Sequence, residues 1–314
     1  MDAFLELHPG SPIVRDVLGT LDATAIRAHV QALEPEADEV FLFEASVGAL
    51  FGVRRRDGSR VAIKLHTLFT DEAYFDDVQL VQAALADAEV GAPRPLGRRG
   101  LAVWEAWLDE GTFCDAHEPV VRTAMARALR RFIEKATGTG IRPRRPFLRP
   151  ADALWPKPHN VLFDFEATAA GAEWIDEIGW AAREIPSAGA EVVGHTDWAA
   201  KHVRFDDDLG VTAIYDWDSV TTDLEPRFVG SAAGCFTYTE ELAEPVRLWP
   251  TADESLAFVA DYESARGEPF TEEERRATRA ACVYLRAYAA RCQHAHAGEA
   301  RSSGLEAFAE VLFG

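Results

Sequence analysis

Two acidic motifs flank a short predicted β-hairpin in residues 194–219, and this arrangement constrains the fold more than any other feature of the sequence. The stretch reads GHTDWAAKHVRFDDDLGVTAIYDWDS. Residues 203–205 and 211–215 read as short strands, and the polar segment between them reads as a turn. Because a hairpin brings its two ends together, we expect Asp197 and Asp216 to face one cavity from neighbouring loops.

Two carboxylates at one cavity suit phosphoryl transfer. One carboxylate orients the attacking hydroxyl and accepts its proton, and another holds the metal that bridges the nucleotide phosphates. The sequence therefore makes Asp197 and Asp216 the candidates for these two roles.

A small antiparallel sheet is predicted near the N-terminus. Its strands are the apolar runs 39–43, 50–55, 60–65 and 101–107. The Asp57-Gly58 pair predicts a tight turn between the second and third strands, because glycine tolerates a positive φ. One helix is expected over 71–88, with Val78, Val81 and Leu85 on one face.

The rest of the chain is predicted to be mainly helical. After a helix over 11–33 and the sheet, further helices are expected at 119–135, 255–266 and 271–294. A capping box of Thr271 and Glu274 begins the last of these. The fold class is therefore α+β, with an N-terminal lobe over residues 1–107 and a helical C-terminal lobe over 108–314.

The acidic motifs also resemble those of a known family. His195-x-Asp197 and Asp216-Trp217-Asp218 are similar to the H-G-D…N…D-W-[DE] pattern of the aminoglycoside phosphotransferase family. That resemblance implies the two-lobed protein-kinase-like fold, with Asp197 as the catalytic carboxylate and Asp216 as the metal ligand. It also implies ATP-dependent phosphorylation of hydroxyls on small molecules such as aminoglycosides, choline, homoserine and sugars.

The resemblance extends upstream to the predicted sheet. Lys64, in the segment VAIK, matches the strand lysine that contacts the nucleotide phosphates. Ser46 and Gly48 lie where a phosphate-covering loop belongs, and Glu105 and Trp107 lie where the hinge contacts adenine.

The resemblance also implies a carboxylate partner for Lys64 on the helix at 71–88. Asp77 fits the expected spacing best. An aspartate is shorter than the glutamate that kinases usually place there.

Three positions depart from the family pattern. His202 replaces the metal-binding Asn, and three explanations stay open: a lost second metal, a softer metal such as Mn²⁺, or a hydrogen bond from His202 to a neighbouring carboxylate. Thr196 replaces the usual glycine. Ala199 lies where kinases often place a cation. Lys201 either supplies that charge instead or is a surface lysine without this role.

The composition limits which classes of partner we expect the protein to bind. The formal net charge of −20 disfavours nucleic acid and anionic membranes and would attract a cationic acceptor. The N-terminus lacks signal-peptide features and no apolar run approaches the ~20 residues of a membrane span, so we expect a cytoplasmic protein. The four cysteines have no zinc spacing.

The leading hypothesis is a small-molecule kinase that uses ATP or GTP with Mg²⁺, or Mn²⁺, to phosphorylate an aminoglycoside, sugar, amino sugar or amino alcohol. The alternative is a catalytically impaired pseudokinase that acts as a nucleotide-binding regulatory module, for which His202 is the main argument. A protein kinase is disfavoured because no A-P-E segment follows the second acidic motif.

Overall fold

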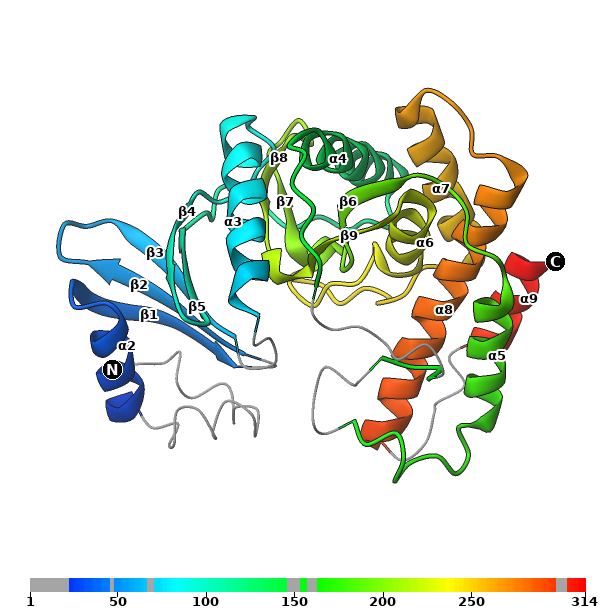
Figure 1. The fold of residues 1–314 in the computed structure, drawn as a ribbon, viewed down its shortest axis with the longest axis horizontal. Helices are drawn as coiled ribbons and strands as arrows, with labels where there is room; N and C mark the ends of the chain where they lie inside the picture. Colours follow the sequence, from blue (N-terminus) through cyan, green and yellow to red (C-terminus); the bar gives the residue numbers. More distant parts are fainter. Residues whose placement is uncertain (1–22, 46–47, 67–70, 146–152, 157–162, 298–303) are drawn as a thin grey trace.

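The N-terminal part of the computed structural model is a five-stranded antiparallel sheet with strand order β1-β2-β3-β5-β4 (Figure 1). The structure describes residues 23–45, 48–66, 71–145, 153–156, 163–297 and 304–314. The strands span β1 Ala37–Ala45, β2 Ala49–Arg55, β3 Arg60–Leu65, β4 Pro95–Arg99 and β5 Ala102–Ala106. Four of them confirm the predicted strands, whereas β4 was not predicted.

The predicted turn between β2 and β3 is present. Gly58 has a φ of 86°, and the Asp57 carboxylate accepts a hydrogen bond from the Ser59 N–H at 2.9 Å. These two features close the hairpin because glycine adopts the left-handed conformation at little cost.

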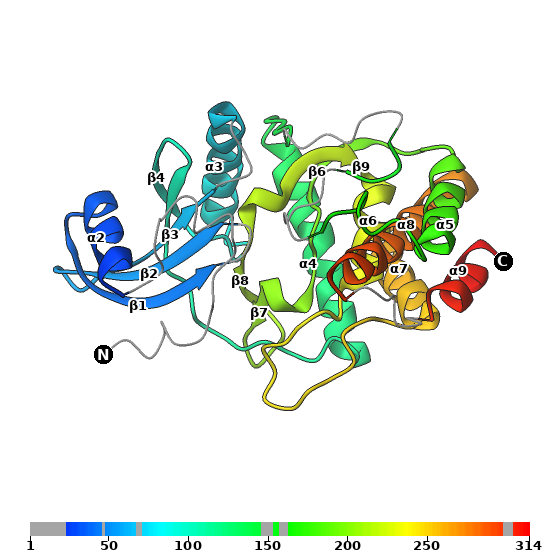
Figure 2. The same cartoon turned by 90° about the horizontal axis from the view of Figure 1, so that it is seen from below.

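Helix α2, Ala23–Leu33, covers one face of the sheet (Figures 1 and 2). Its Ile26 and Val30 are buried against Phe51 and Ile63 of the sheet, in a small core of their own. The helix predicted over 11–33 is thus present from Ala23, and residues 11–22 lie outside the described residues.

Helix α3, Glu72–Asp87, begins at the N-cap Asp71, whose carboxylate accepts from the Ala73 N–H at 3.0 Å. The predicted apolar face is buried, but it packs into the larger core of the C-terminal part rather than into the core under α2. By sequence α3 belongs to the proposed lobe 1–107, and by packing it belongs to the core of the proposed lobe 108–314.

The C-terminal part is mainly helical, as predicted. Its helices are α4 Pro119–Gly138, α5 Glu173–Glu184, α6 Glu225–Cys235, α7 Ala252–Arg266, α8 Glu272–Ala297 and α9 Leu305–Phe313. The capping box before α8 is present, with Thr271 Oγ1 accepting from the Glu274 N–H at 3.2 Å and Glu274 accepting from the Thr271 N–H at 2.8 Å. Helices α5 and α9 were not predicted.

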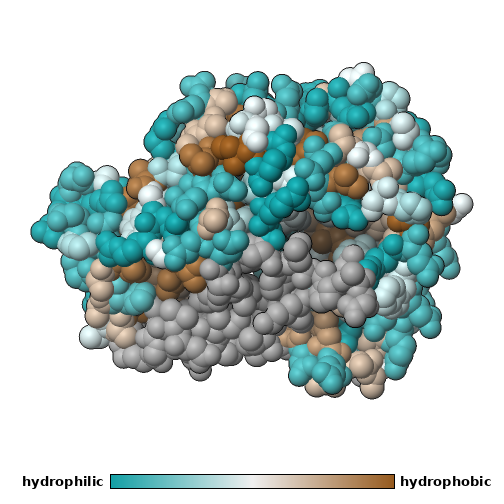
Figure 3. All heavy atoms as spheres, in the orientation of Figure 1, coloured by the Kyte–Doolittle hydropathy of each residue, from teal (hydrophilic) through white to brown (hydrophobic). Residues whose placement is uncertain are grey.

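Two small antiparallel sheets lie between the N-terminal sheet and helices α6–α9 (Figure 2). One pairs β6, Glu191–His195, with β9, Val220–Leu224. The other pairs β7, Val203–Phe205, with β8, Val211–Ile214, and is the hairpin that the sequence predicts. Hydrophilic residues predominate among the described residues on the face seen in Figure 3, and no helix within the described ranges is long and apolar enough to span a bilayer.

Candidate active site

The two acidic motifs occupy loops that are joined at both ends by the small sheets. On one side, the Thr196 N–H donates to the Ser219 carbonyl at 2.9 Å, next to the pair formed by β6 and β9. On the other side, the Tyr215 N–H donates to the His202 carbonyl at 2.9 Å, beyond the last pair of β7 and β8. The loops 196–202 and 215–219 are therefore held against each other.

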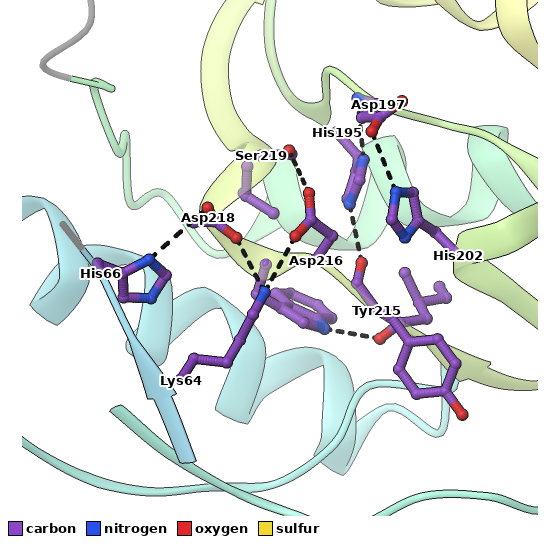
Figure 4. A network of polar contacts seen from close by, with 12 residues as sticks. Lys64, His66, His195, Asp197, His202, Tyr215, Asp216, Asp218 and Ser219 are labelled. Atoms are coloured by element: carbon purple, nitrogen blue, oxygen red, sulfur yellow. Dashed lines mark hydrogen bonds and ion pairs between the residues drawn. The ribbon is translucent and has the colours of Figure 1, made fainter. Parts of the chain in front are cut away.

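This arrangement brings the two predicted carboxylates together (Figure 4). Asp197, His202 and Asp216 each offer one ligand atom, and these atoms lie within 4.8 Å of one another. The hairpin predicted that both carboxylates face one site, and these positions agree with that prediction.

Lys64 reaches the same site from β3. Its Nζ lies 3.0 Å from Asp216 Oδ1 and 3.0 Å from Asp218 Oδ1 (Figure 4). Burial alone would lower the pKa of the Lys64 ammonium, but the two carboxylates outweigh burial and raise that pKa. Lys64 is therefore a fixed cation in the centre of the site.

The structure corrects the partner expected for Lys64. Asp77 forms no ion pair with Lys64 in the part of the chain that the structure describes, because the inward face of α3 is apolar and includes Tyr74 and Val78. The Tyr74 hydroxyl instead bonds the carbonyls of Asp218 at 2.7 Å and Val220 at 2.8 Å. Helix α3 therefore anchors the loop of Asp216 through a tyrosine rather than through a carboxylate.

His195 braces the loop of Asp197. Its Nδ1 accepts a hydrogen bond from the Asp197 N–H at 3.2 Å, and its Nε2 therefore donates to the Tyr215 carbonyl at 3.0 Å. Burial and the neighbouring His202 both lower the pKa of His195, which favours this neutral tautomer. His195 thus links the two acidic loops.

The Asp197 carboxylate is held in its ionised form. Burial would raise its pKa, but His202 and Lys201 outweigh burial and hold the pKa well below the ordinary value. His202 Nε2 donates to Asp197 Oδ2 at 3.0 Å, and Lys201 Nζ lies 3.7 Å from the same oxygen. With 41% of the side chain exposed, Asp197 can still receive a hydroxyl group.

Lys201 is more than a surface lysine. Its ammonium group lies 5.0 Å from the centre of the Tyr238 ring, besides its approach to Asp197. Attraction between a cation and an aromatic face helps to hold the side chain beside the carboxylate.

Asp216 has an unusual backbone. Its φ of 63° and ψ of 51° are left-handed, a conformation that is uncommon for residues other than glycine but tolerated by aspartate. Ser219 Oγ donates to Asp216 Oδ2 at 2.8 Å and fixes the carboxylate. Burial would raise the pKa of Asp216, and Lys64, followed by His202, outweighs it and lowers that pKa well below the ordinary value.

Two tryptophans of the acidic motifs serve packing. Trp198 and Trp217 are buried, and their indole N–H groups donate to the carbonyls of Met125 at 3.1 Å and Ile214 at 2.8 Å. Neither indole lies among the described residues that line the cavity.

The ligand set fits a divalent cation. Two carboxylates and one imidazole offer hard oxygen and borderline nitrogen atoms, a combination that suits Mn²⁺ better than Mg²⁺. The hydrogen bond from His202 to Asp197 shows that the imidazole also has a role without metal. Of the three explanations of His202, these contacts fit the softer metal and the hydrogen bond to a carboxylate.

The remaining nucleotide-side residues lie around one cavity of about 1520 Å³. Gly48 lines it, and a Cβ there would lie 2.5 Å from the Leu65 carbonyl oxygen, so this position accepts only glycine without rearrangement. Trp107 also lines it, but the backbone N–H of Trp107 donates to the Arg60 carbonyl at 3.2 Å and is therefore not free to bond adenine. Ser46 lies outside the described residues.

Glu105 lies in β5 with its side chain beside Lys64 rather than at an exposed hinge. It pairs in register with Ala62 of β3, two residues from Lys64, so the two side chains share one face of the sheet. Glu105 is 8% exposed. Burial raises its pKa and the nearby ammonium of Lys64 opposes that rise.

Asp218 and Tyr74 are site residues to which sequence reasoning gave no role. Asp218 belongs to the recognised D-W-D motif, so a signal for it was present. Tyr74 had no distinguishing signal, since an inward tyrosine on an amphipathic helix usually only packs.

Comparisons with known proteins address the fold. No protein-family model and no curated protein sequence matches the chain. Among solved structures, the amicoumacin kinase hAmiN in complex with AMP-PNP, Ca²⁺ and Ami matches with a TM-score of 0.58 and 10% identity over 93% of this chain and 96% of that one.

Two antibiotic phosphotransferases match similarly. Aminoglycoside phosphotransferase APH(4)-Ia, in a ternary complex with AMP-PNP and hygromycin B, has a TM-score of 0.55 and 14% identity over 91% of this chain and 98% of that one. Macrolide 2'-phosphotransferase MphH from Brachybacterium faecium has a TM-score of 0.52 and 14% identity over 95% and 98%. The chain therefore has the two-lobed, protein-kinase-like fold of these enzymes.

Proposed function

From this fold and this site, we propose that the chain is a phosphotransferase that moves the γ-phosphoryl group of ATP, or GTP, to a hydroxyl of a small molecule. The observation that carries the proposal is the meeting of Asp197, Asp216 and Lys64 at one cavity. Solved structures of the same fold include complexes with AMP-PNP, which supports a nucleotide in this cavity. We place the protein in the cytoplasm.

In the proposed reaction, Asp197 orients the acceptor hydroxyl and receives its proton. The hydroxyl oxygen forms a bond to the γ-phosphorus, the bond between that phosphorus and the β,γ-bridging oxygen breaks, and the nucleoside diphosphate leaves. Because the low pKa of Asp197 makes it a weak base, its main contribution is to position the hydroxyl. The hydroxyl becomes more acidic as its oxygen donates electrons to phosphorus, and its proton then moves to Asp197.

Lys64 neutralises charge on the nucleotide phosphates in this proposal. Its two present partners, Asp216 and Asp218, compete for the same ammonium, so nucleotide binding exchanges at least one carboxylate contact for a phosphate contact. Glu105 lies on the same face of the sheet as Lys64 and adds an electrostatic attraction for the ammonium. We therefore assign Glu105, rather than Asp77, as the residue that positions Lys64.

Asp216 would hold the divalent cation, with His202 as a second ligand. When bound, the cation supplies positive charge to the β- and γ-phosphates. Gly48 and Trp107 would contact the nucleotide from the N-terminal sheet and the adjoining segment.

The test compares Asp197→Ala with the control Asp207→Ala, in the exposed turn between β7 and β8. ADP release is measured with both metals against aminoglycosides, sugars, amino sugars and amino alcohols, and affinity for AMP-PNP is measured by calorimetry. Asp197→Ala should lower kcat by roughly 100-fold or more while AMP-PNP affinity stays nearly constant. An Asp197→Ala variant with full activity would refute this role.

A regulatory nucleotide-binding module remains the second candidate. It is favoured by His202, whose hydrogen bond occupies Asp197 Oδ2, the oxygen that a substrate hydroxyl would otherwise approach. AMP-PNP binding without ADP release from any acceptor would support this candidate over the enzyme.

A further inference from the structure

We propose that the acceptor is a hydroxyl compound with a large apolar body and a neutral or anionic charge, rather than a polyamine. This inference rests on the proposed function and names its substrate class. It replaces the cationic acceptor that the net charge of −20 suggests. The argument comes from the part of the cavity wall that lies beyond Asp197, away from the N-terminal sheet.

Helix α8 supplies an apolar stripe to this wall. Its lining residues recur at intervals of three and four, as one face of a helix requires: Ala277, Ala280, Ala281, Tyr284, Leu285 and Tyr288. No charged side chain of the helix belongs to the stripe among the described lining residues. The stripe therefore offers a continuous surface to an apolar body.

One of the two tyrosine hydroxyls of the stripe is bonded to the protein backbone. The Tyr284 hydroxyl donates to the Leu154 carbonyl at 2.7 Å, and the Tyr284 ring lies 5.3 Å from the ring of Trp155. Tyr284 is therefore fixed at both its hydroxyl and its ring. A ligand at this wall meets the side of an immobilised aromatic ring and the methyl groups of the alanines.

Charge on the same wall is balanced, whereas the whole protein is strongly acidic. The chain has 32 Lys and Arg against 52 Asp and Glu. Among the described lining residues at and beyond Asp197, there are three cations and three carboxylates: Arg183, Lys201 and Arg227, and Asp197, Asp223 and Glu241.

Two of those three carboxylates already have cationic partners. Arg227 Nη1 lies 3.1 Å from Asp223 Oδ1, and Lys201 Nζ lies 3.7 Å from Asp197 Oδ2. Recognition of a polyamine needs several uncompensated carboxylates, because each ammonium loses water when it enters the cavity. The described wall offers Glu241 alone for that purpose.

Arg183 gives the wall its affinity for a negative or neutral polar group. Its guanidinium lies 5.0 Å from the ring centre of Trp180 and donates to the Ala153 carbonyl, which fixes it at the cavity. A fixed guanidinium binds carboxylate or ester oxygens well because its donors are planar.

The experiment uses the full chain with three probes: a neutral steroid glycoside, a steroid glucuronide and the polyamine kanamycin. Binding of each probe in the presence of AMP-PNP and Mn²⁺ is measured by calorimetry, and ADP release is measured with ATP. We expect the two steroid compounds to bind roughly tenfold or more tightly than kanamycin. Tighter binding of kanamycin, or equal binding of all three, would overturn the inference.

Two variants with matched controls localise the effect. Leu285→Gln should weaken both steroid probes, whereas Val311→Gln on the exposed face of α9 should not. Arg183→Gln should weaken the glucuronide more than the neutral glycoside, whereas Arg276→Gln on the exposed face of α8 should change neither. Unchanged probe affinities in Leu285→Gln and Arg183→Gln would refute the assigned wall.

AMP-PNP binding separates this inference from the proposed function. If AMP-PNP binds and kanamycin is the preferred acceptor, the phosphotransferase stands and the acceptor class is wrong. If AMP-PNP does not bind and no probe leads to ADP release, the proposed function fails and the acceptor class fails with it.

Discussion

His66 makes the stability of the protein depend on pH. It directly follows β3, its side chain is only 7% exposed, and its ring stacks on the Phe75 ring at 4.4 Å. Burial lowers the pKa of His66 from 6.5 to about 4, against the attraction of Asp218, whose Oδ2 lies 3.7 Å away. The folded protein therefore keeps His66 neutral where the unfolded chain protonates it.

The direction and size of the effect follow from this difference. Since the folded pKa lies below the unfolded one, the unfolded state binds more protons, and stability falls as the pH drops from 6.5 towards 4. The full difference corresponds to about 3 kcal/mol, and about 2 kcal/mol of it is lost between roughly pH 7 and pH 5.

Urea unfolding, followed by tryptophan fluorescence, measures this loss. His66→Gln removes the titrating group, so its free energy of unfolding should fall by about 2 kcal/mol less than that of the wild type between those two pH values. His296→Gln, an exposed histidine near the end of α8, is the control and should behave as the wild type. If His66→Gln lost stability on acidification as steeply as the wild type, the assignment of the pH effect to His66 would be wrong.

Three further predictions concern the site. Asp216→Ala should weaken Mn²⁺-dependent AMP-PNP binding by roughly 100-fold, because a metal ligand is lost, and calorimetry showing unchanged affinity would contradict the metal role. Glu105→Gln should lower kcat/KM for ATP by roughly tenfold because Lys64 is less well positioned, while Glu39→Gln on the exposed edge strand β1 should have no effect. His202→Asn should raise activity with Mg²⁺ relative to Mn²⁺, since an amide oxygen replaces an imidazole nitrogen, and an unaltered ratio would argue against His202 as a ligand.

The sequence predicted those elements whose pattern is strong and local. The hairpin of β2 and β3 has an Asp-Gly turn, and α3, α4 and α8 have long apolar periodicity. Strand β4, PLGRR, was missed because it is a short edge strand with little apolar character. Helix α5 was missed because its buried face includes Gly179, where a Cβ would lie 2.5 Å from the Trp155 ring.

The site was predictable where adjacent segments build it. Asp197 and Asp216 are joined by one hairpin, so the sequence itself indicated that they meet. The contact of Lys64 with Asp218 joins residues 154 positions apart and depends on how the N-terminal sheet approaches the loop. Which face of α3 points inward also depends on packing. Asp77 lies one position before Val78, so its side chain leaves the helix outside the face that includes Tyr74 and Val78.

The attachment of α3 determines which parts of the protein can move together. Tyr74 ties this helix to the backbone of residues 218 and 220, while α2 and the strands β1 and β2 share a separate core. Arg98 of β4 also forms ion pairs with Glu72 and Asp76 of α3, so this helix links the N-terminal sheet to the loop of Asp216. If the cleft opens to admit a nucleotide, the distance between Lys64 and Asp216 would report the opening, because one residue belongs to the sheet and the other to the loop.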